Sequence, residues 1–225
     1  MPTVLITGAK RGIGRGLVDR FLEQGWDVLA AGRDASSSPL AELDRVRTVD
    51  FDVTDEASIK TAAASLIGVP IDLLINNAGV FDADYSNLAD VSVEQWQRDF
   101  AVNTMGPVLV ARAFLPNLRA GGRKQLAVIS STMASMGKNA MGFHYSYRST
   151  KAGVNAAWVS LSLDLADDDF TCVVLCPGWV RTDMGGPSAA LSVEESTGGL
   201  FKVLNGLTAA DNGRFINYAG EEVAW

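Results

Sequence analysis

Apolar and polar residues alternate along this chain in blocks, and the lengths of the blocks predict strands and helices in turn. Seven short runs are rich in apolar and β-branched residues, as in buried strands. They occupy residues 3–8, 27–32, 46–51, 71–77, 125–131, 171–178 and 214–220. The segments between them carry apolar residues at helical spacing, near 13–24, 55–67, 92–118, 147–167 and 193–206. Strand and helix are therefore expected to alternate from end to end.

This alternation indicates βαβ units and a parallel sheet covered by helices on both faces. The strand runs are apolar almost throughout, which is typical of strands buried on both faces. Two helix starts carry the pattern of a capping box, Ser92 with Gln95 and Ser192 with Glu195. No repeat or low-complexity tract marks a boundary. We expect an α/β fold with one doubly wound domain over residues 1–225 and a parallel sheet of about seven strands.

Composition narrows the choice of partners. The 225 residues are 48% hydrophobic and carry a formal net charge of −7. There is no block of Lys or Arg and no basic helix face, so neither nucleic acid nor a membrane is an expected partner. The N-terminal residues lack the features of a signal peptide, and no run reaches the roughly 18 apolar residues of a spanning helix. A cytoplasmic protein is expected.

The two cysteines, Cys172 and Cys176, lie in one predicted strand. Four residues of strand span roughly 13 Å, which is too far for a disulfide, since bonded cysteines have Cα atoms within about 7 Å. Two thiols and the single His144 do not make a zinc site. We expect buried, unreactive cysteines and no metal.

A glycine-rich turn follows the first strand, in the sequence TGAKRGIGRG at residues 7–16. Gly8, Gly12 and Gly14 permit a tight turn and let the backbone approach a pyrophosphate, while the helix that begins near Ile13 offers free N–H groups and a partial positive charge. A turn without a ligand is the alternative. The spacing T-G-x-x-x-G-x-G resembles the classical short-chain dehydrogenase/reductase family, which implies a Rossmann fold that binds NAD or NADP.

Further motifs stand where this resemblance requires them, and together they span essentially the whole chain. NNAG follows the fourth strand, FDVTD closes the third and PGWVRTD leaves the sixth. For Asp52 a helix-capping carboxylate near Thr54 is the alternative to a role beside adenine. The resemblance implies cofactor contacts, near adenine and the central sheet, from Asp52, Val53, Asn77, Ala78 and Gly79, and, near the nicotinamide, from Pro177, Gly178, Val180 and Thr182.

The second strand ends in AAGRD, at residues 30–34, and this ending bears on the choice of cofactor. The family's NAD enzymes carry a carboxylate where this chain has Gly32. The next residue is Arg33, and a guanidinium favours a 2′-phosphate. Arg11 in the glycine turn offers a second cation, while Asp34 complicates the assignment because it could pair with Arg33. We expect NADPH/NADP⁺, with NADH as the second choice.

The stretch YSYRSTK contains Tyr147 and Lys151 at i, i+4, which places them on one helix face with Cβ atoms roughly 5–6 Å apart. A nearby ammonium is expected to lower the pKa of Tyr147 from its usual value near 10. Tyr147 would then donate a proton to a carbonyl oxygen. Tyr145 has no lysine at this spacing. The resemblance also implies that both residues contact the nicotinamide ribose. A catalytic role for His144 is not expected.

Two more groups complete the implied catalytic set. In the family a serine at the end of the fifth strand holds the substrate carbonyl, and Ser131 matches this position. Ser130 is only the second candidate, because its side chain should point to the other face of the strand. Asn103 lies four residues before Pro107, whose missing N–H leaves the carbonyl of residue 103 without its helical donor. The family's asparagine at this kink holds a relay water through that carbonyl.

Apolar side chains near these motifs suggest the substrate. Met133, Phe143, Trp179 and Met184 are candidate pocket residues. Segment 184–193 is interpreted as a mobile flap with two glycines as hinges, and a simple connection is the alternative. The resemblance, closest to the carbonyl-reductase and C-factor-like branch, implies NADPH-dependent reduction of a small apolar aldehyde or ketone by a homodimer or homotetramer. A nucleotide-binding sensor with incidental turnover is the alternative, and a sugar-nucleotide epimerase is disfavoured.

Overall fold

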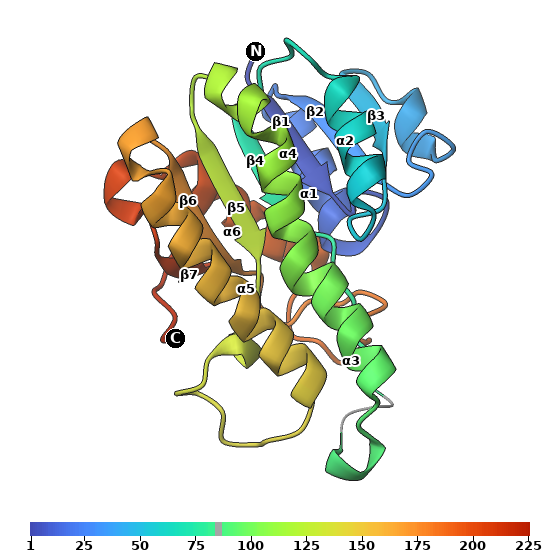
Figure 1. Cartoon of the computed structure of the whole chain (residues 1–225), viewed down its shortest axis with the longest axis vertical. Coiled ribbons are helices and arrows are strands. Elements are labelled where there is room, and N and C mark those ends of the chain that lie inside the picture. The colour runs from blue at the N-terminus through green and yellow to red at the C-terminus, as the bar shows by residue number, and fades with distance from the viewer. Residues whose placement is uncertain (84–86) are drawn as a thin grey trace.

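The computed structural model describes residues 1–83 and 87–225, and its centre is a parallel sheet of seven strands (Figure 1). The strand order is β3-β2-β1-β4-β5-β6-β7, so the chain reverses direction across the sheet between β1 and β4. This reversal is the position where doubly wound folds bind ligands, at the carboxyl ends of the strands. The strands are β1 Thr3–Thr7, β2 Asp27–Gly32, β3 Val46–Asp50, β4 Leu73–Asn76, β5 Gln125–Ile129, β6 Thr171–Cys176 and β7 Phe215–Asn217.

Helices cover both faces of the sheet, as expected. The apolar residues of one face pack with α2, α4 and α5, and those of the other face pack with α1 and α6. Strands β4, β5 and β6 are buried along their whole length, which explains their continuous apolar runs, whereas the edge strand β3 is partly exposed. The helices are α1 Gly12–Glu23, α2 Glu56–Ala64, α3 Val93–Phe100, α4 Gly106–Ala120, α5 Tyr145–Asp164 and α6 Val193–Asn205.

The long helix expected over 92–118 is divided into three parts. A π-helix, Ala101–Met105, joins α3 to α4, and Pro107 stands in the first turn of α4. The amide of Gly106 donates to the carbonyl of Ala101, five residues back. The helix path therefore changes close to Asn103, where the proline predicted a kink.

The two expected capping boxes differ in outcome. At α6 the box is complete, because Ser192 and Glu195 exchange both hydrogen bonds. At α3 only Ser92 takes part, since its hydroxyl accepts from the amide of Gln95. The Gln95 side chain donates instead to Asp99 at 2.8 Å. The prediction of a full capping box at α3 was therefore wrong for the Gln95 side chain, although it was correct for Ser92. Asp99 is a buried carboxylate that accepts from both Gln95 and Ser146, so it holds the Gln95 side chain away from the N-terminus of α3.

Two other expectations concern cysteines and membranes. Cys172 and Cys176 are both buried and free, as predicted. Among the described residues, none of the helices has the length and hydropathy required to cross a bilayer. The same residues contain no cluster of three or more His, Cys, Asp or Glu side chains arranged to hold a metal ion.

Candidate active site

The glycine turn between β1 and α1 has the conformation that only small residues allow. Gly8 and Gly12 adopt φ of +66° and +54°. A Cβ on Gly14 would lie 2.1 Å from the carbonyl oxygen of Gly8. The N-cap residue of α1, Arg11, forms no side-chain cap hydrogen bond, and the first turn contains no acidic residue. The open amides and the partial positive charge of this helix start suit a pyrophosphate.

The NNAG turn after β4 is bonded directly to the glycine turn. The Thr7 hydroxyl accepts from the amides of Asn77 and Ala78, each at 3.0 Å. The Asn77 side chain donates to the carbonyls of Thr7 at 2.9 Å and Gly8 at 3.3 Å. These bonds cross the reversal point of the sheet, so the two turns form one rigid floor at the carboxyl ends of β1 and β4.

Asn103 connects that floor to the catalytic helix. The residue is fully buried, and its Oδ1 accepts from the amide of Val80 at 2.9 Å. Its Nδ2 donates to the carbonyl of Val80 at 2.9 Å and to the Thr150 hydroxyl at 3.2 Å. A Cβ on Gly79 would lie 3.2 Å from Asn103 Oδ1 and 3.5 Å from Lys151 Nζ. The sequence pointed to the main-chain carbonyl of Asn103 and missed this use of its side chain.

Lys151 and Tyr147 lie on one face of α5, as their spacing predicted. Lys151 is 4% exposed, and its Nζ donates to the carbonyl of Ile129 at 2.8 Å. The same Nζ lies 5.8 Å from the centroid of the Tyr147 ring. Burial lowers the pKa of Lys151 to about 8. An ammonium at this depth is retained because it has a carbonyl partner at the end of β5.

The expected lowering of the tyrosine pKa was wrong for this structure. Burial raises the pKa of Tyr147 to about 12, although a hydrogen bond with Ser131 acts in the other direction. Desolvation of the phenolate is the largest cause and Cys176 adds to it, while the Lys151 ammonium is directed at the carbonyl of Ile129. Tyr147 is therefore held in its protonated form, the form that a general acid requires.

The two candidate serines at the end of β5 point to different sides. Ser130 is 2% exposed, and its hydroxyl donates to Asn155 Oδ1 at 2.6 Å, away from Tyr147. The Ser131 side chain is close enough to act on the pKa of Tyr147, and its hydroxyl accepts from the amide of Met133 at 3.1 Å. Of the two serines, the geometry favours Ser131 beside the tyrosine.

Phe81 is a site residue that the sequence analysis missed. Its ring meets Tyr147 edge-on at 4.9 Å between centroids and meets His144 at 5.1 Å. Burial, with Arg148 as a further cause, lowers the pKa of His144. An aromatic residue two positions after NNAG was the available signal. Phe81 and His144 form an aromatic wall beside the tyrosine.

The cations expected at the 2′-phosphate are exposed. Arg33 is 75% exposed and lies 4.0 Å from Asp52 rather than pairing with Asp34. Asp52 Oδ1 also accepts from the amide and hydroxyl of Thr54, as in the capping alternative, while Asp55 caps α2. Arg11 pairs with Asp183 at 3.3 Å. Such exposed pairs are weak, so either guanidinium can exchange its carboxylate for a phosphate.

The segment after β6 packs against the glycine turn. A Cβ on Gly12 would lie 3.3 Å from Thr182 Cγ2, and Val180 bridges to Leu191. Gly178, with φ of +81°, has no room for a Cβ beside Leu191. The carbonyl of Pro177 accepts from the Ser196 hydroxyl at 2.7 Å. These contacts place Thr182 beside Gly12 of the glycine turn.

The expected flap is tied down by side chains at both ends. Trp179 Nε1 donates to the carbonyl of Gly185 at 2.8 Å. The Arg181 guanidinium donates to the carbonyls of Ala189 and Ala190 at 3.0 and 2.9 Å. In this structure the backbone of segment 184–193 is therefore held by side chains that precede it.

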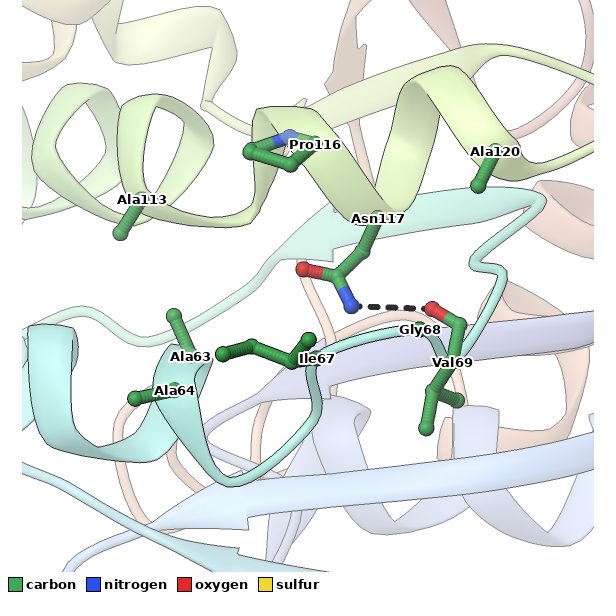
Figure 2. Close-up of a pocket in the computed structure, with 9 residues that line it drawn as sticks. All are labelled: Ala63, Ala64, Ile67, Gly68, Val69, Ala113, Pro116, Asn117 and Ala120. Atoms are coloured by element: carbon green, nitrogen blue, oxygen red, sulfur yellow. Dashed lines mark hydrogen bonds between the residues drawn. The ribbon is translucent and has the colours of Figure 1, made fainter.

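The four predicted pocket residues form an open surface. Phe143, Trp179 and Met184 are 51%, 58% and 46% exposed, and Met133 is half-buried. A cavity of about 230 Å³ lies elsewhere, between α2 and α4 (Figure 2). There Asn117 donates to the carbonyls of Leu66 and Val69 at 2.6 and 2.9 Å. Because none of the predicted site residues lines it, we assign this cavity to helix packing.

The remaining predicted residues lie in the same region. Ile13 stands in the first turn of α1, and the carbonyl of Val53 lies close to Gly106 at the start of α4. The structure brings together the glycine turn, the NNAG turn, Asn103 and the Tyr147–Lys151 face. Arg33 and the exposed apolar residues Phe143, Trp179 and Met184 lie on the surface outside this group.

Comparison with known proteins agrees with this geometry. Residues 2–190 match the short chain dehydrogenase family. The C-signal of Myxococcus xanthus is 42% identical over 167 residues, which cover 74% of this chain and all of the relative. NADPH-bound carbonyl reductase from chicken fatty liver is 35% identical with a TM-score of 0.92, covering 100% of this chain and 99% of the other. Carbonyl reductase Sniffer of D. melanogaster is 31% identical with a TM-score of 0.94 and full coverage of both chains.

Proposed function

The chain belongs to the short-chain dehydrogenase family, in the branch that contains these carbonyl reductases and C-signal, and on that premise we propose that it reduces an aldehyde or ketone to an alcohol with NADPH. One observation carries the proposal. Tyr147, Ser131 and Lys151 come together at the carboxyl end of β5, and burial keeps the Tyr147 phenol protonated by raising its pKa. This is the arrangement that proton delivery to a carbonyl oxygen requires.

The proposed chemistry divides between cofactor and protein. Bound NADPH supplies a hydride to the carbonyl carbon. Tyr147 donates its proton to the carbonyl oxygen, and the Ser131 hydroxyl holds that oxygen in place. Lys151 stabilises negative charge on Tyr147 as the proton leaves, because its ammonium lies on the same helix face. The main-chain carbonyl of Asn103 anchors a relay water that returns the proton.

The cofactor lies along the strand ends in this proposal. Gly8, Gly12, Ile13 and Gly14 hold the pyrophosphate at the start of α1. Arg11 and Arg33 bind the 2′-phosphate. Adenine and the central part of the cofactor contact Asp52, Val53, Asn77, Ala78 and Gly79, while the nicotinamide half contacts Tyr147, Lys151, Pro177, Gly178, Val180 and Thr182.

The preference for NADPH over NADH rests on charge at the end of β2. Gly32 contributes no carboxylate there, and Arg33 follows it with a side chain that is 75% exposed. The carbonyl reductase from chicken fatty liver, which is 35% identical, is NADPH-bound. We infer that Arg33 leaves Asp52 when a 2′-phosphate enters.

The substrate is proposed to be a small apolar carbonyl compound. Met133, Phe143, Trp179 and Met184 surround the approach to Tyr147 in this proposal, and the flap 184–193 covers it. The alternative of a sensor with incidental turnover is weaker, because a protein that only binds a nucleotide has no need of a protonated Tyr147. We also propose a homodimer or homotetramer, which light scattering would test.

A cofactor and substrate panel tests the proposal directly. Purified protein is incubated with NADPH or NADH and a set of apolar aldehydes and ketones, and loss of nicotinamide absorbance is recorded. We expect turnover with NADPH on several carbonyls and slower turnover with NADH. Tight NADPH binding without any turnover would favour the sensor. Binding of neither nucleotide would reject both functions.

A further inference from the structure

Arg148 follows Tyr147 directly but has no part in the chemistry proposed above. It lies in the first helical turns of α5, where the partial positive charge of a helix start disfavours a cation. Its side chain turns back to the preceding loop. Nε donates to the carbonyls of Gly142 and Phe143, each at 3.0 Å, and Nη1 donates to the carbonyl of Met133 at 3.2 Å. One guanidinium therefore joins both ends of the 133–143 loop to the catalytic helix.

The loop held by Arg148 ends in an unusual backbone. Gly142, Phe143 and His144 have φ of +70°, +58° and +54°, so three consecutive residues are left-handed and two of them carry side chains. His144 is the N-cap of α5 and forms no side-chain cap hydrogen bond. Non-glycine residues keep this conformation only where their surroundings impose it. Two of the hydrogen bonds that hold this conformation come from Arg148, to the carbonyls of Gly142 and Phe143.

The strained residues lead directly to the aromatic wall. His144 follows the carbonyl that Arg148 holds, and its ring packs on Phe81 at 5.1 Å. Phe81 in turn packs edge-on against Tyr147 at 4.9 Å. Movement of the backbone at Phe143 would therefore displace the wall beside the Tyr147 ring without any change in the residues Tyr147, Ser131 or Lys151 themselves.

We propose that Arg148 is a specificity-determining positioning residue, which fixes the aromatic wall of Phe81 and His144 against which an apolar carbonyl substrate lies. The inference rests on the proposed carbonyl reduction. Arginine is required because its planar guanidinium donates to the carbonyl oxygens of Gly142, Phe143 and Met133 at the same time. Lysine keeps the charge but lacks the fork.

The test compares Arg148→Lys and Arg148→Ala with Arg119→Ala. Arg119 is a suitable control because its guanidinium bonds Asp168 outside the site. Each protein is assayed with NADPH on a bulky aryl ketone and on a small aliphatic aldehyde. We expect both Arg148 variants to raise KM for the aryl ketone about tenfold, the scale of a lost apolar contact. The kcat for the aldehyde is expected to stay close to wild type, and Arg119→Ala should match wild type on both.

Hydrogen exchange of the amides in segment 132–144 supplies a readout that does not depend on turnover. We expect faster exchange there in both Arg148 variants and no change in Arg119→Ala. Three results would overturn the role of Arg148. They are an equal loss of activity on the two substrates, a wild-type KM for the aryl ketone in Arg148→Lys, and unchanged hydrogen exchange in segment 132–144. A wild type that reduces no carbonyl would instead reject the proposed function, and the specificity role with it.

Discussion

Two groups of polar side chains lie at the carboxyl ends of the strands, and they differ in burial. Asn103 and Lys151 are 0% and 4% exposed, and each has bonds to backbone atoms of other segments. Arg33 and Arg11 are 75% and 81% exposed, and each faces one carboxylate. The buried groups proposed to handle protons are therefore fixed before a ligand arrives, whereas the exposed arginines proposed to select the nucleotide can change partners. The first group should tolerate no substitution, and the second should be adjustable.

Tyr147→Phe should give the largest effect on the buried side of this comparison. Loss of the phenolic proton removes the general acid, and we expect kcat/KM for carbonyl reduction to fall by about a thousandfold. NADPH binding and thermal stability should change little because the ring remains. Tyr145→Phe is the matched control and should keep its activity. Full turnover by Tyr147→Phe would exclude this residue as the acid.

Asn103→Ala should cost stability as well as turnover. The substitution leaves the amide and carbonyl of Val80 without their side-chain partners, and each unsatisfied buried group costs about 1–3 kcal/mol. We expect the free energy of unfolding, measured with urea, to fall by about 3 kcal/mol. Asn205→Ala, an exposed asparagine bonded to Arg123, should change it by far less. Equal losses in the two variants would contradict the role of Asn103 in joining the NNAG turn to α5.

The buried Lys151 predicts a pH dependence of stability with a definite sign. Its pKa is about 8 in the folded protein and 10.5 without burial. Below pH 8 both states are protonated and the folded state carries the full burial penalty. Between these pKa values only the unfolded state holds the proton, so stability rises with pH by about 1.4 kcal/mol per unit.

Urea unfolding at pH 8, 9 and 10 of wild type and Lys151→Met measures this difference. The wild type should gain stability relative to the variant over this range. Tyr147 has a raised pKa and acts in the opposite direction only above pH 10, and it is present in both proteins. Parallel curves for the two proteins would show that Lys151 titrates normally.

Arg33→Ala should show the adjustable side of the comparison. We expect the Kd for NADPH to rise about tenfold or more, from loss of hydrogen bonds to a charged phosphate. The Kd for NADH and the kcat should stay close to wild type. Arg47→Ala removes an exposed guanidinium on the neighbouring strand and is the control. Equal weakening of both nucleotides would show that Arg33 does not read the 2′-phosphate.

Asp183→Asn should give the smallest effect. It breaks the ion pair with Arg11, whose side chains are 81% and 83% exposed, and such pairs contribute under about 1 kcal/mol. Thermal unfolding should scarcely change at moderate salt. A large destabilisation would mean that this contact fastens the segment after β6 to the glycine turn.

The order of strands and helices was predictable from the sequence because each element obeys a local rule. Apolar runs and glycine positions located β1, β4 and the turn between β1 and α1 within a few residues. The break near Asn103 was also indicated, by Pro107. Its form as a π-helix was not, and the Asn103 side chain within it bonds Val80 and Thr150, which are distant in sequence.

The arrangement of the candidate side chains was easier to predict from the sequence than their electrostatics. Spacing placed Tyr147 and Lys151 on one face, but spacing does not report burial, and burial sets the pKa of both. The start of α5 lies at Tyr145, ahead of the expected 147, because His144 is left-handed, which periodicity cannot show. The partner of Arg33 was likewise decided by the tertiary position of Asp52.

The π-helix has a consequence for the phase of the helices on either side of it. One extra residue in a turn rotates everything beyond it by about 100° around the axis. Before the turn, α3 directs Trp96 to the Ser149 hydroxyl on α5 at 2.8 Å, and after it α4 directs Val110, Phe114 and Leu118 into the sheet. Deleting one residue from Ala101–Met105 would restore a regular helix but point one of these two faces at the wrong neighbour. The π-helix thus allows α3 to contact α5 while α4, which continues from it, packs against the sheet.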